Sequence, residues 1–300
     1  MEKRMLAKPD VKTTVLGFGA MEIPKLDWNE SAKLLNEVLD RGINFVDTSP
    51  CYGISEEMIG KGISHRRNEF FLSTKCCCNT TGEGPGHIFD RKTAMMNIEN
   101  SLRVMKTDHV DILQLHAPMP EDLPGGPTDD LVQALYDMKR DGKILHASIT
   151  FKNSGPQDPK YPAQYGLECL KAFMDWGVFD TMQTVYGGLV RTAEDAIREA
   201  SEKGIGIIVR GVLKRYFPNY DELYDKAGLD ELCEPGEDRN SFLLRYAISS
   251  PGVCTAIVGT KSLEHLKQNI AAAERGVLPA DIYKLAQEKL ASVGIAPGRC

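Results

Sequence analysis

The chain has 300 residues, of which 42% are hydrophobic and 26% charged, and its formal net charge is -6. Such a composition predicts a globular protein with a large core, and the acidic balance argues against nucleic-acid binding or a basic membrane-binding face. The sequence contains no run of about 18 apolar residues, so we expect no transmembrane helix. The N-terminal residues are charged and no apolar run follows them, so we expect no secretory signal. We therefore expect a cytoplasmic chain that acts on a small molecule.

Short apolar runs alternate with amphipathic stretches along the chain. Apolar runs that end at a polar residue or glycine predict strands at 15–19, 43–46, 69–74, 110–115, 143–150, 178–185, 206–210 and 254–259. Helical spacing of apolar residues predicts helices at 31–41, 92–106 and 129–140, and at about 193–203, 239–248 and 262–273.

This alternation predicts an α/β fold, because parallel strands need a crossover helix between them. Eight such strands favour a (β/α)8 TIM barrel that spans residues 1–300 as one domain. An open doubly wound sheet is the alternative, but Gly17 and Gly19 lack the third glycine and helix start of a phosphate-binding loop. Long irregular stretches at 117–128, 151–165 and 214–238 each follow a strand, at the C-terminal face where barrel enzymes build their sites.

Eight cysteines raise the question of a metal or a disulfide. Cys76, Cys77 and Cys78 are consecutive, and neighbouring residues on an extended chain point to opposite faces. Zinc and iron–sulfur sites use separated cysteines such as C-x₂-C, and that spacing is absent from the sequence. We therefore expect small apolar side chains in the core and no metal site.

Four polar residues fall at or just beyond the ends of three successive strands. Asp47 and Tyr52 follow the second predicted strand, Lys75 the third and His116 the fourth. Each alone has an ordinary structural interpretation, such as a turn cap or a solvated side chain. In a barrel, however, these strand ends meet at one mouth, so all four together predict a site.

The motifs FVDTSPCYG, LSTK and LQLHAP resemble those of the aldo-keto reductase family, and the likeness extends from VLGFGAM to VGTKSLEHLKQN. The resemblance implies that Asp47, Tyr52, Lys75 and His116 form a catalytic tetrad for carbonyl reduction with a nicotinamide cofactor. The chemistry fits: a phenol is a slow acid near neutrality, and a lysine ammonium beside it favours its ionised form. Asp47 would hold the ammonium in place, and His116 would orient the carbonyl.

The resemblance also implies a cofactor cleft over the barrel mouth. Thr150 and Gln183 correspond to carboxamide partners, although Phe151 replaces the usual Asn beside that hydroxyl. Arg210 replaces a frequent stacking tyrosine and is expected to stack, to contact a phosphate or to form a structural salt bridge. The remaining predicted contacts are Gly19, Ala20, Met21, Asp47, Gly211, Val212, Leu213, Gly259, Thr260, Lys261, His265, Gln268 and Asn269.

Lys261 favours NADP(H), although His265 stands where many NADP-selective relatives have Arg, so NAD(H) stays an alternative. The expected substrate is a small carbonyl compound or alcohol, bound by Trp28, Tyr52, His116 and Phe151. Met21, Tyr186 and Phe217 are further candidates for the pocket wall.

Two other functions stay open. One is a redox-sensing regulatory subunit of the same fold, and the other is Schiff-base chemistry at Lys75, which Asp47 disfavours by keeping the amine charged. Oxidation of Cys51, next to Tyr52, is a weaker hypothesis. Oligomeric state, physiological substrate and reaction direction are not predicted.

Overall fold

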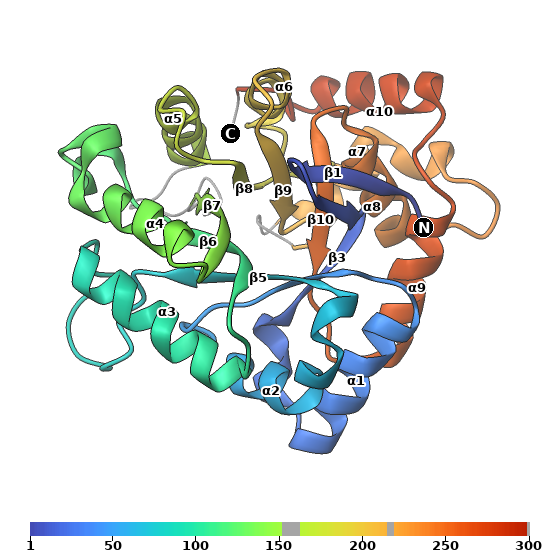
Figure 1. Cartoon of the computed structure of the whole chain (residues 1–300). Coiled ribbons are helices and arrows are strands. Elements are labelled where there is room, and N and C mark those ends of the chain that lie inside the picture. The colour runs from blue at the N-terminus through green and yellow to red at the C-terminus, as the bar shows by residue number, and fades with distance from the viewer. Residues whose placement is uncertain (152–162, 215–218, 299–300) are drawn as a thin grey trace.

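Eight parallel strands form a closed barrel within the described residues, and helices surround it (Figure 1). The computed structural model describes residues 1–151, 163–214 and 219–298, and of residues 163–165 it describes the backbone alone. The strands, in order around the barrel, are β10 (Val253–Val258), β3 (Leu16–Gly19), β4 (Phe45–Asp47), β5 (Phe71–Cys76), β6 (Val110–His116), β7 (Ile144–Thr150), β8 (Thr181–Val185) and β9 (Gly206–Arg210). The predicted (β/α)8 fold is confirmed, and every predicted strand overlaps one of these.

The register of the strands brings their C-terminal residues to one mouth. Gly19 of β3 pairs with Asp47 of β4, and Lys75 of β5 pairs with Gln114 of β6. On the far side of the barrel, Thr150 pairs with Gln183. Side chains two residues apart on a strand share a face, so this register determines which polar side chains can meet inside the mouth.

Ten helices of at least eight residues lie in the described ranges. They are α1 (Trp28–Asp40), α2 (Ser55–Gly62), α3 (Arg91–Met105), α4 (Asp130–Arg140), α5 (Ala163–Met174), α6 (Glu194–Glu202), α7 (Tyr220–Ala227), α8 (Arg239–Ser249), α9 (Leu263–Glu274) and α10 (Ala280–Ser292). Six correspond to predicted helices. The expectation of irregular structure over 214–238 is wrong, because α7 lies within it, and α5 begins inside the stretch 151–165, of which 152–162 lie outside the described residues.

Helix α1 begins before the residue predicted from its apolar spacing. Asp27 caps it by accepting a hydrogen bond from the Glu30 N–H at 2.8 Å, and the Glu30 carboxylate accepts one from the Asp27 N–H at 3.2 Å. This capping box satisfies backbone donors that the first turn leaves unpaired. The helix therefore starts at Trp28 rather than at Ser31.

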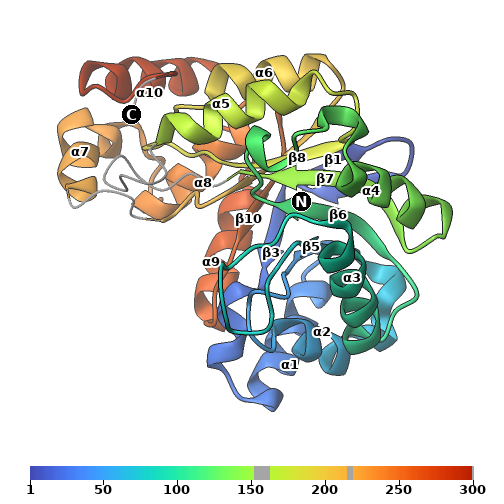
Figure 2. The ribbon, with the colours of Figure 1, turned by 90° about the vertical axis from the view of Figure 1, so that its left-hand side faces the viewer.

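An antiparallel hairpin of β1 (Lys3–Ala7) and β2 (Val11–Thr14) covers the N-terminal end of the barrel, opposite the end where α7 lies (Figure 2). Its apolar residues Leu6 and Val11 pack in one cluster with Phe45 and other inward side chains of the barrel. At Gly206 a Cβ atom would lie 1.7 Å from the Leu6 carbonyl oxygen, so this close approach requires glycine. This hairpin is not among the predicted elements.

The larger part of the core lies between the barrel and the surrounding helices. In the ranges described, none of the helices combines the length and apolar character needed to cross a membrane. With one end of the barrel covered by the hairpin, the other end carries the polar strand termini. That end holds the candidate site.

Candidate active site

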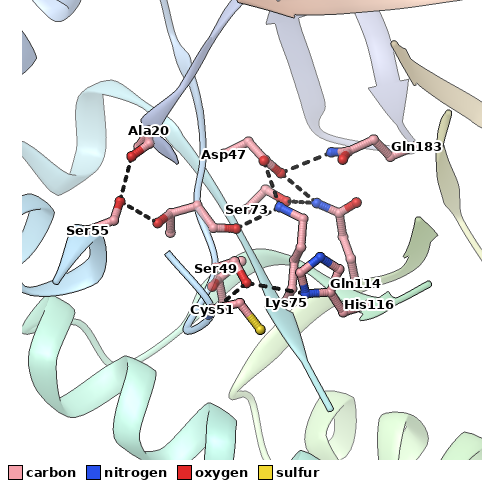
Figure 3. A network of polar contacts seen from close by, with 12 residues as sticks. Ala20, Asp47, Ser49, Cys51, Ser55, Ser73, Lys75, Gln114, His116 and Gln183 are labelled. Carbon is pink, nitrogen blue, oxygen red and sulfur yellow. Dashed lines mark hydrogen bonds and ion pairs between the residues drawn. The ribbon is translucent and has the colours of Figure 1, made fainter. Parts of the chain in front are cut away.

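A buried ion pair joins Lys75 and Asp47 at the ends of β5 and β4 (Figure 3). Lys75 Nζ donates hydrogen bonds to Asp47 Oδ2 and to the Thr48 carbonyl oxygen, both at 2.7 Å. Lys75 is 1% exposed and Asp47 2% exposed. A charge this deeply buried is retained only when it is paired and hydrogen-bonded, and both conditions are met here.

The second carboxylate oxygen of Asp47 accepts hydrogen bonds from two side-chain amides on other strands of the barrel. Gln114 Nε2 donates to Asp47 Oδ1 at 2.7 Å, and Gln183 Nε2 donates to the same atom at 3.0 Å. Gln114 also donates to Ser73 Oγ at 2.7 Å. These contacts fix Asp47 from β6 and β8 at once, so the carboxylate that holds Lys75 is itself held rigidly.

Tyr52 and His116 lie beside the ammonium group. The Lys75 Nζ atom is 5.0 Å from the centroid of the Tyr52 ring. The Tyr52 and His116 rings meet edge to face, with centroids 6.3 Å apart. The structure thus brings all four residues of the predicted tetrad together, although they come from three separate strand ends.

The charge state of Lys75 follows from these contacts. Burial alone would lower the pKa of Lys75, because it penalises the ammonium form. The Asp47 carboxylate and the Tyr52 phenol outweigh that penalty and raise the pKa of Lys75 above its ordinary value. The side chain is therefore a charged donor at neutral pH rather than a free amine.

A buried carboxyl group near this pair is not among the predicted site residues. Glu56 of α2 accepts hydrogen bonds from Thr74 Oγ1 at 2.5 Å and from Ser101 Oγ at 3.0 Å. Burial raises the pKa of Glu56 from 4.5 to about 7, and the two hydroxyl groups and the Lys75 charge only partly oppose that rise. Glu56 therefore titrates near neutral pH.

This titration predicts a pH-dependent stability that Glu56→Gln removes. The pKa of Glu56 is higher in the folded state than in the unfolded chain, so protonated Glu56 stabilises the fold at pH values below its unfolded pKa. This stabilisation is lost as the pH rises through about 7. The wild-type free energy of unfolding should fall relative to Glu56→Gln by about 2.5 kcal/mol between about pH 5 and about pH 8. Urea unfolding at both pH values measures it, with the exposed Glu57→Gln as control. Identical pH dependence in wild type and Glu56→Gln would contradict the assignment.

Two cysteines and a second histidine surround His116. The His116 Nδ1 atom lies 3.2 Å from Cys78 Sγ and 3.4 Å from Ser49 Oγ. The His87 ring meets the His116 ring with centroids 4.4 Å apart, and Cys51 Sγ lies 3.8 Å from His87 Nε2. A hydrogen bond from the Cys78 thiol lowers the pKa of Cys51. Of the consecutive cysteines, Cys76 and Cys77 pack in the core as expected, whereas Cys78 faces the site.

A cleft of about 570 Å³ opens beside Tyr52, along the ends of β3, β9 and β10. At one point of its lining the backbone after β10 lies close to β3, because a Cβ atom on Gly259 would lie 2.7 Å from the Gly19 carbonyl oxygen. The predicted site residues that line it are Gly19, Met21, Asp47, Tyr52, Arg210, Gly211, Val212, Leu213, Gly259, Thr260 and Lys261, and Glu22, Lys214, Ile257 and Val258 line it as well.

Other predicted cofactor residues lie outside the lining of this cleft. Ala20 is fully buried, and its carbonyl oxygen accepts a hydrogen bond from Ser55 Oγ at 2.9 Å. His265, Gln268 and Asn269 follow on α9, where His265 and Gln268 are exposed. Thr150 at the end of β7 and Gln183 in the middle of β8 are both buried.

The barrel mouth fits a cofactor carboxamide at Gln183. Its Oε1 atom is buried and has no hydrogen-bond partner among the described residues, while its Nε2 atom binds Asp47. An unsatisfied buried oxygen is costly, so a donor from a bound group is expected there. Arg210 Nη2 donates to the Phe151 carbonyl oxygen at 2.8 Å, which is a structural contact, while its side chain also borders the cleft.

Two of the predicted substrate residues lie away from the cleft. The Phe151 ring is 1% exposed and packs against Phe173, on the core side of β7. Trp28 begins α1, where Lys61 Nζ lies 3.7 Å from its ring centroid. Tyr186 is buried and bonded to Glu194, and Phe217 lies outside the described residues. Tyr52 and His116 reach the site, and Met21, a further candidate for the pocket wall, lines the cleft.

Some of the site residues that were not predicted could have been found from the alternation of side chains along a strand, and others could not. Gln114 lies two residues before His116 on the same strand, so alternation places both on the inner face. Ser73 relates to Lys75 in the same way. Glu56 and His87 had no such signal, because each lies on a segment whose position depends on tertiary packing.

The chain is similar to known oxidoreductases over almost its full length. The uncharacterized oxidoreductase YqkF of Bacillus subtilis is 25% identical over 96% of this chain and 96% of its own. L-galactose dehydrogenase of Arabidopsis thaliana is 25% identical over 91% of this chain and 88% of its own. Among solved structures, the holo form of aldo-keto reductase AKR11C1 from Bacillus halodurans has a TM-score of 0.81 and 26% identity, covering 96% of each chain.

The family model described as "Aldo/keto reductase family" matches residues 15–291. The matched range includes all eight barrel strands, the Asp47–Lys75 ion pair, Tyr52, His116 and the cleft. The chain therefore belongs to the aldo/keto reductase family.

Proposed function

We propose that this chain reduces the carbonyl group of small aldehydes or ketones, or oxidises the corresponding alcohols, with NADP(H) as the preferred cofactor and Tyr52 as the proton donor or acceptor. The observation that carries the proposal is the buried Lys75 ammonium, which is held by Asp47 and the Thr48 carbonyl and lies against the Tyr52 phenol. Family membership supports the reaction class.

Each residue of the tetrad has a distinct task in this proposal. The Tyr52 hydroxyl donates a proton to the carbonyl oxygen as negative charge develops on it. The phenolate left behind is stabilised by the Lys75 ammonium, whose position depends on Asp47. His116, beside Tyr52, donates a hydrogen bond that orients the carbonyl oxygen. When bound, the nicotinamide cofactor supplies or accepts the hydride.

The same contacts disfavour Schiff-base chemistry at Lys75. A Schiff base needs a neutral amine with a free lone pair. Lys75 instead donates two hydrogen bonds at 2.7 Å, and its pKa is raised rather than lowered, although burial works against that. Lys75 is thus an electrostatic partner of Tyr52 and not a nucleophile.

The cofactor would be held by residues at both ends of the cleft. Gln183 Oε1 and the Thr150 hydroxyl would bind the carboxamide in the barrel mouth. Arg210 and Lys261 would place positive charge along the phosphates, and Lys261 would neutralise a 2′-phosphate. Glu22 also borders the cleft, but the Lys25 Nζ atom lies 2.6 Å from its carboxylate and offsets that charge.

Lys261→Ala tests the preference for NADP(H). Removing one ammonium from a phosphate contact should weaken NADPH binding by about 10-fold or more and leave NADH binding nearly unchanged. Fluorescence titration of both reduced cofactors measures the two affinities. Lys267→Ala, which changes an exposed lysine on α9 just after Lys261, is the matched control. Equal losses for NADPH and NADH, or tighter NADH binding by the wild type, would contradict the preference.

The proposed reaction is tested by a panel of aldehydes, ketones, quinones and sugars, followed through the loss of NADPH absorbance and repeated in the oxidative direction with NADP⁺. Sugars belong in the panel because one relative is named a galactose dehydrogenase. We expect substrate-dependent turnover with at least one class. Tight NADPH binding without turnover of any of them would indicate a redox-sensing barrel instead of an enzyme.

A further inference from the structure

Four donor atoms of the kind that soft metal ions prefer converge at the edge of the active site. The side chains of Cys51, Cys78, His87 and His116 each offer one sulfur or ring nitrogen, and these atoms all lie within 4.8 Å of one another. Two of the separations are shorter, at 3.2 Å for Cys78 Sγ to His116 Nδ1 and 3.8 Å for Cys51 Sγ to His87 Nε2.

These distances are close to those of a tetrahedral zinc centre. Zinc–sulfur bonds of about 2.3 Å and zinc–nitrogen bonds of about 2.0 Å place neighbouring ligand atoms roughly 3.3–3.8 Å apart. Side-chain movements of roughly 1 Å would bring the widest pair into that range. Two thiolates and two imidazoles also form a donor set that favours Zn²⁺ over the hard ions Mg²⁺ and Ca²⁺, which prefer oxygen ligands.

The backbone around these residues is fixed before any metal binds. Asn97 of α3 accepts from the Cys78 N–H at 2.8 Å and donates to the Cys78 carbonyl at 3.1 Å. Cys78 and His87 face each other in an antiparallel bridge, so the loop between them returns His87 to the site. Cys77 adopts a positive φ of 67°, which breaks the alternation of the strand and turns Cys78 toward His116.

Cys51 and His116 reach the same point from the two neighbouring strand ends. Cys51 follows β4, and the Cys51 N–H donates to Ser49 Oγ at 3.1 Å. Ser49 Oγ lies in turn 3.3 Å from Cys78 Sγ and 3.4 Å from His116 Nδ1. The cluster is therefore built from three consecutive strand-end segments around one serine, as Figure 3 shows for Ser49, Cys51 and His116.

We propose that Cys51, Cys78, His87 and His116 form a binding site for one Zn²⁺ ion, and that the bound ion inhibits the reductase site by taking His116 as a ligand. The expectation of no metal site rested on cysteine spacing along the chain, and it did not consider donors that separate loops bring together. Metal binding itself is independent of the proposed function, whereas the inhibition rests on it.

The binding experiment uses the full chain, reduced and freed of metal by a chelator, and titrates it with Zn²⁺ in a calorimeter. We expect one Zn²⁺ per chain. Cys78→Ser and His87→Ala should each bind Zn²⁺ at least about 100-fold more weakly, because even the loss of a residue that only contacts a metal ligand can lower metal affinity by up to about 100-fold. Cys233→Ser and His109→Ala, which change a cysteine and a histidine outside the cluster, are matched controls and should bind as wild type does. Co²⁺ in place of Zn²⁺ should give the thiolate charge-transfer and strong visible absorption of a tetrahedral site.

Three results would overturn the metal site. They are no Zn²⁺ uptake by the reduced chain, binding unchanged in both cluster variants, and a Co²⁺ spectrum without thiolate absorption. If the reduced chain takes up no metal but forms a Cys51–Cys78 disulfide in air, the cluster is a thiol pair and the proposal is wrong.

The inhibition is tested separately by NADPH turnover with and without Zn²⁺. Wild type should lose activity at the Zn²⁺ concentrations that saturate the calorimetric site and regain it with chelator. His87→Ala should resist the same Zn²⁺ concentrations and keep at them the turnover that this variant has without metal. Binding without inhibition would overturn the inhibitory role alone. Binding by a chain that turns over no substrate would leave the metal site standing and refute the proposed function.

Discussion

Replacing Tyr52 by Phe is expected to lower kcat for aldehyde reduction by about 100-fold to 10,000-fold, because it removes the proton donor from a site that otherwise keeps its shape. The lost hydroxyl contributes little to cofactor binding, so the affinity for NADPH should change by less than about 3-fold. Stopped-flow measurement of the first turnover separates this chemical step from product release.

Tyr136→Phe is the matched control, because Tyr136 is a 44% exposed tyrosine on α4. It should turn over as wild type does. If Tyr52→Phe also retains wild-type turnover while it binds NADPH normally, the assignment of Tyr52 as proton donor is wrong.

The second large effect is expected at Asp47. Asp47→Asn leaves the Lys75 ammonium buried without its counter-ion, and removing one partner of a buried ion pair costs about 3–5 kcal/mol of unfolding free energy. The Asn oxygen can still accept the Gln114 and Gln183 amides, so the loss reports the ion pair rather than the whole network. Activity should fall by at least about 100-fold, since Lys75 no longer stabilises the Tyr52 phenolate.

A double variant separates stability from catalysis. Asp47→Asn with Lys75→Met removes both charges, so most of the lost unfolding free energy should return while the activity stays low. Urea unfolding and NADPH turnover on the same preparations measure the two quantities. A double variant that is as unstable as the sum of the single variants would show that the two charges do not stabilise each other in the fold.

Much of the barrel could be predicted from local patterns. Its strands are short, buried on both faces and bounded by glycine or polar residues, and that pattern is visible in one sequence. The hairpin at Lys3–Thr14 was missed because its charged, exposed positions hide the apolar residues that face the barrel, such as Leu6 and Val11. Helix α2 has two glycines among eight residues, and its place depends on packing rather than on propensity.

In the active site, too, residues at strand ends could be predicted, whereas contacts that depend on loop conformation could not. Asp47, Tyr52, Lys75 and His116 were predicted because strand ends meet at the mouth of any such barrel. The Cys51–His87 contact was not, since a loop conformation that depends on Asn97 and on the left-handed Cys77 brings His87 back. The Phe151 side chain was expected at the substrate, but a strand residue can face the core as readily as the mouth, and packing against Phe173 decides it.

The central claim is direct hydride transfer to a carbonyl carbon at the mouth of this barrel. NADPH carrying deuterium at the transferable position, incubated with the chain and an active aldehyde, tests it by mass spectrometry of the alcohol. We predict that the alcohol gains one deuterium on its former carbonyl carbon, in amounts equal to the NADPH consumed. An alcohol without carbon-bound deuterium, or NADPH consumption without alcohol, would contradict the account.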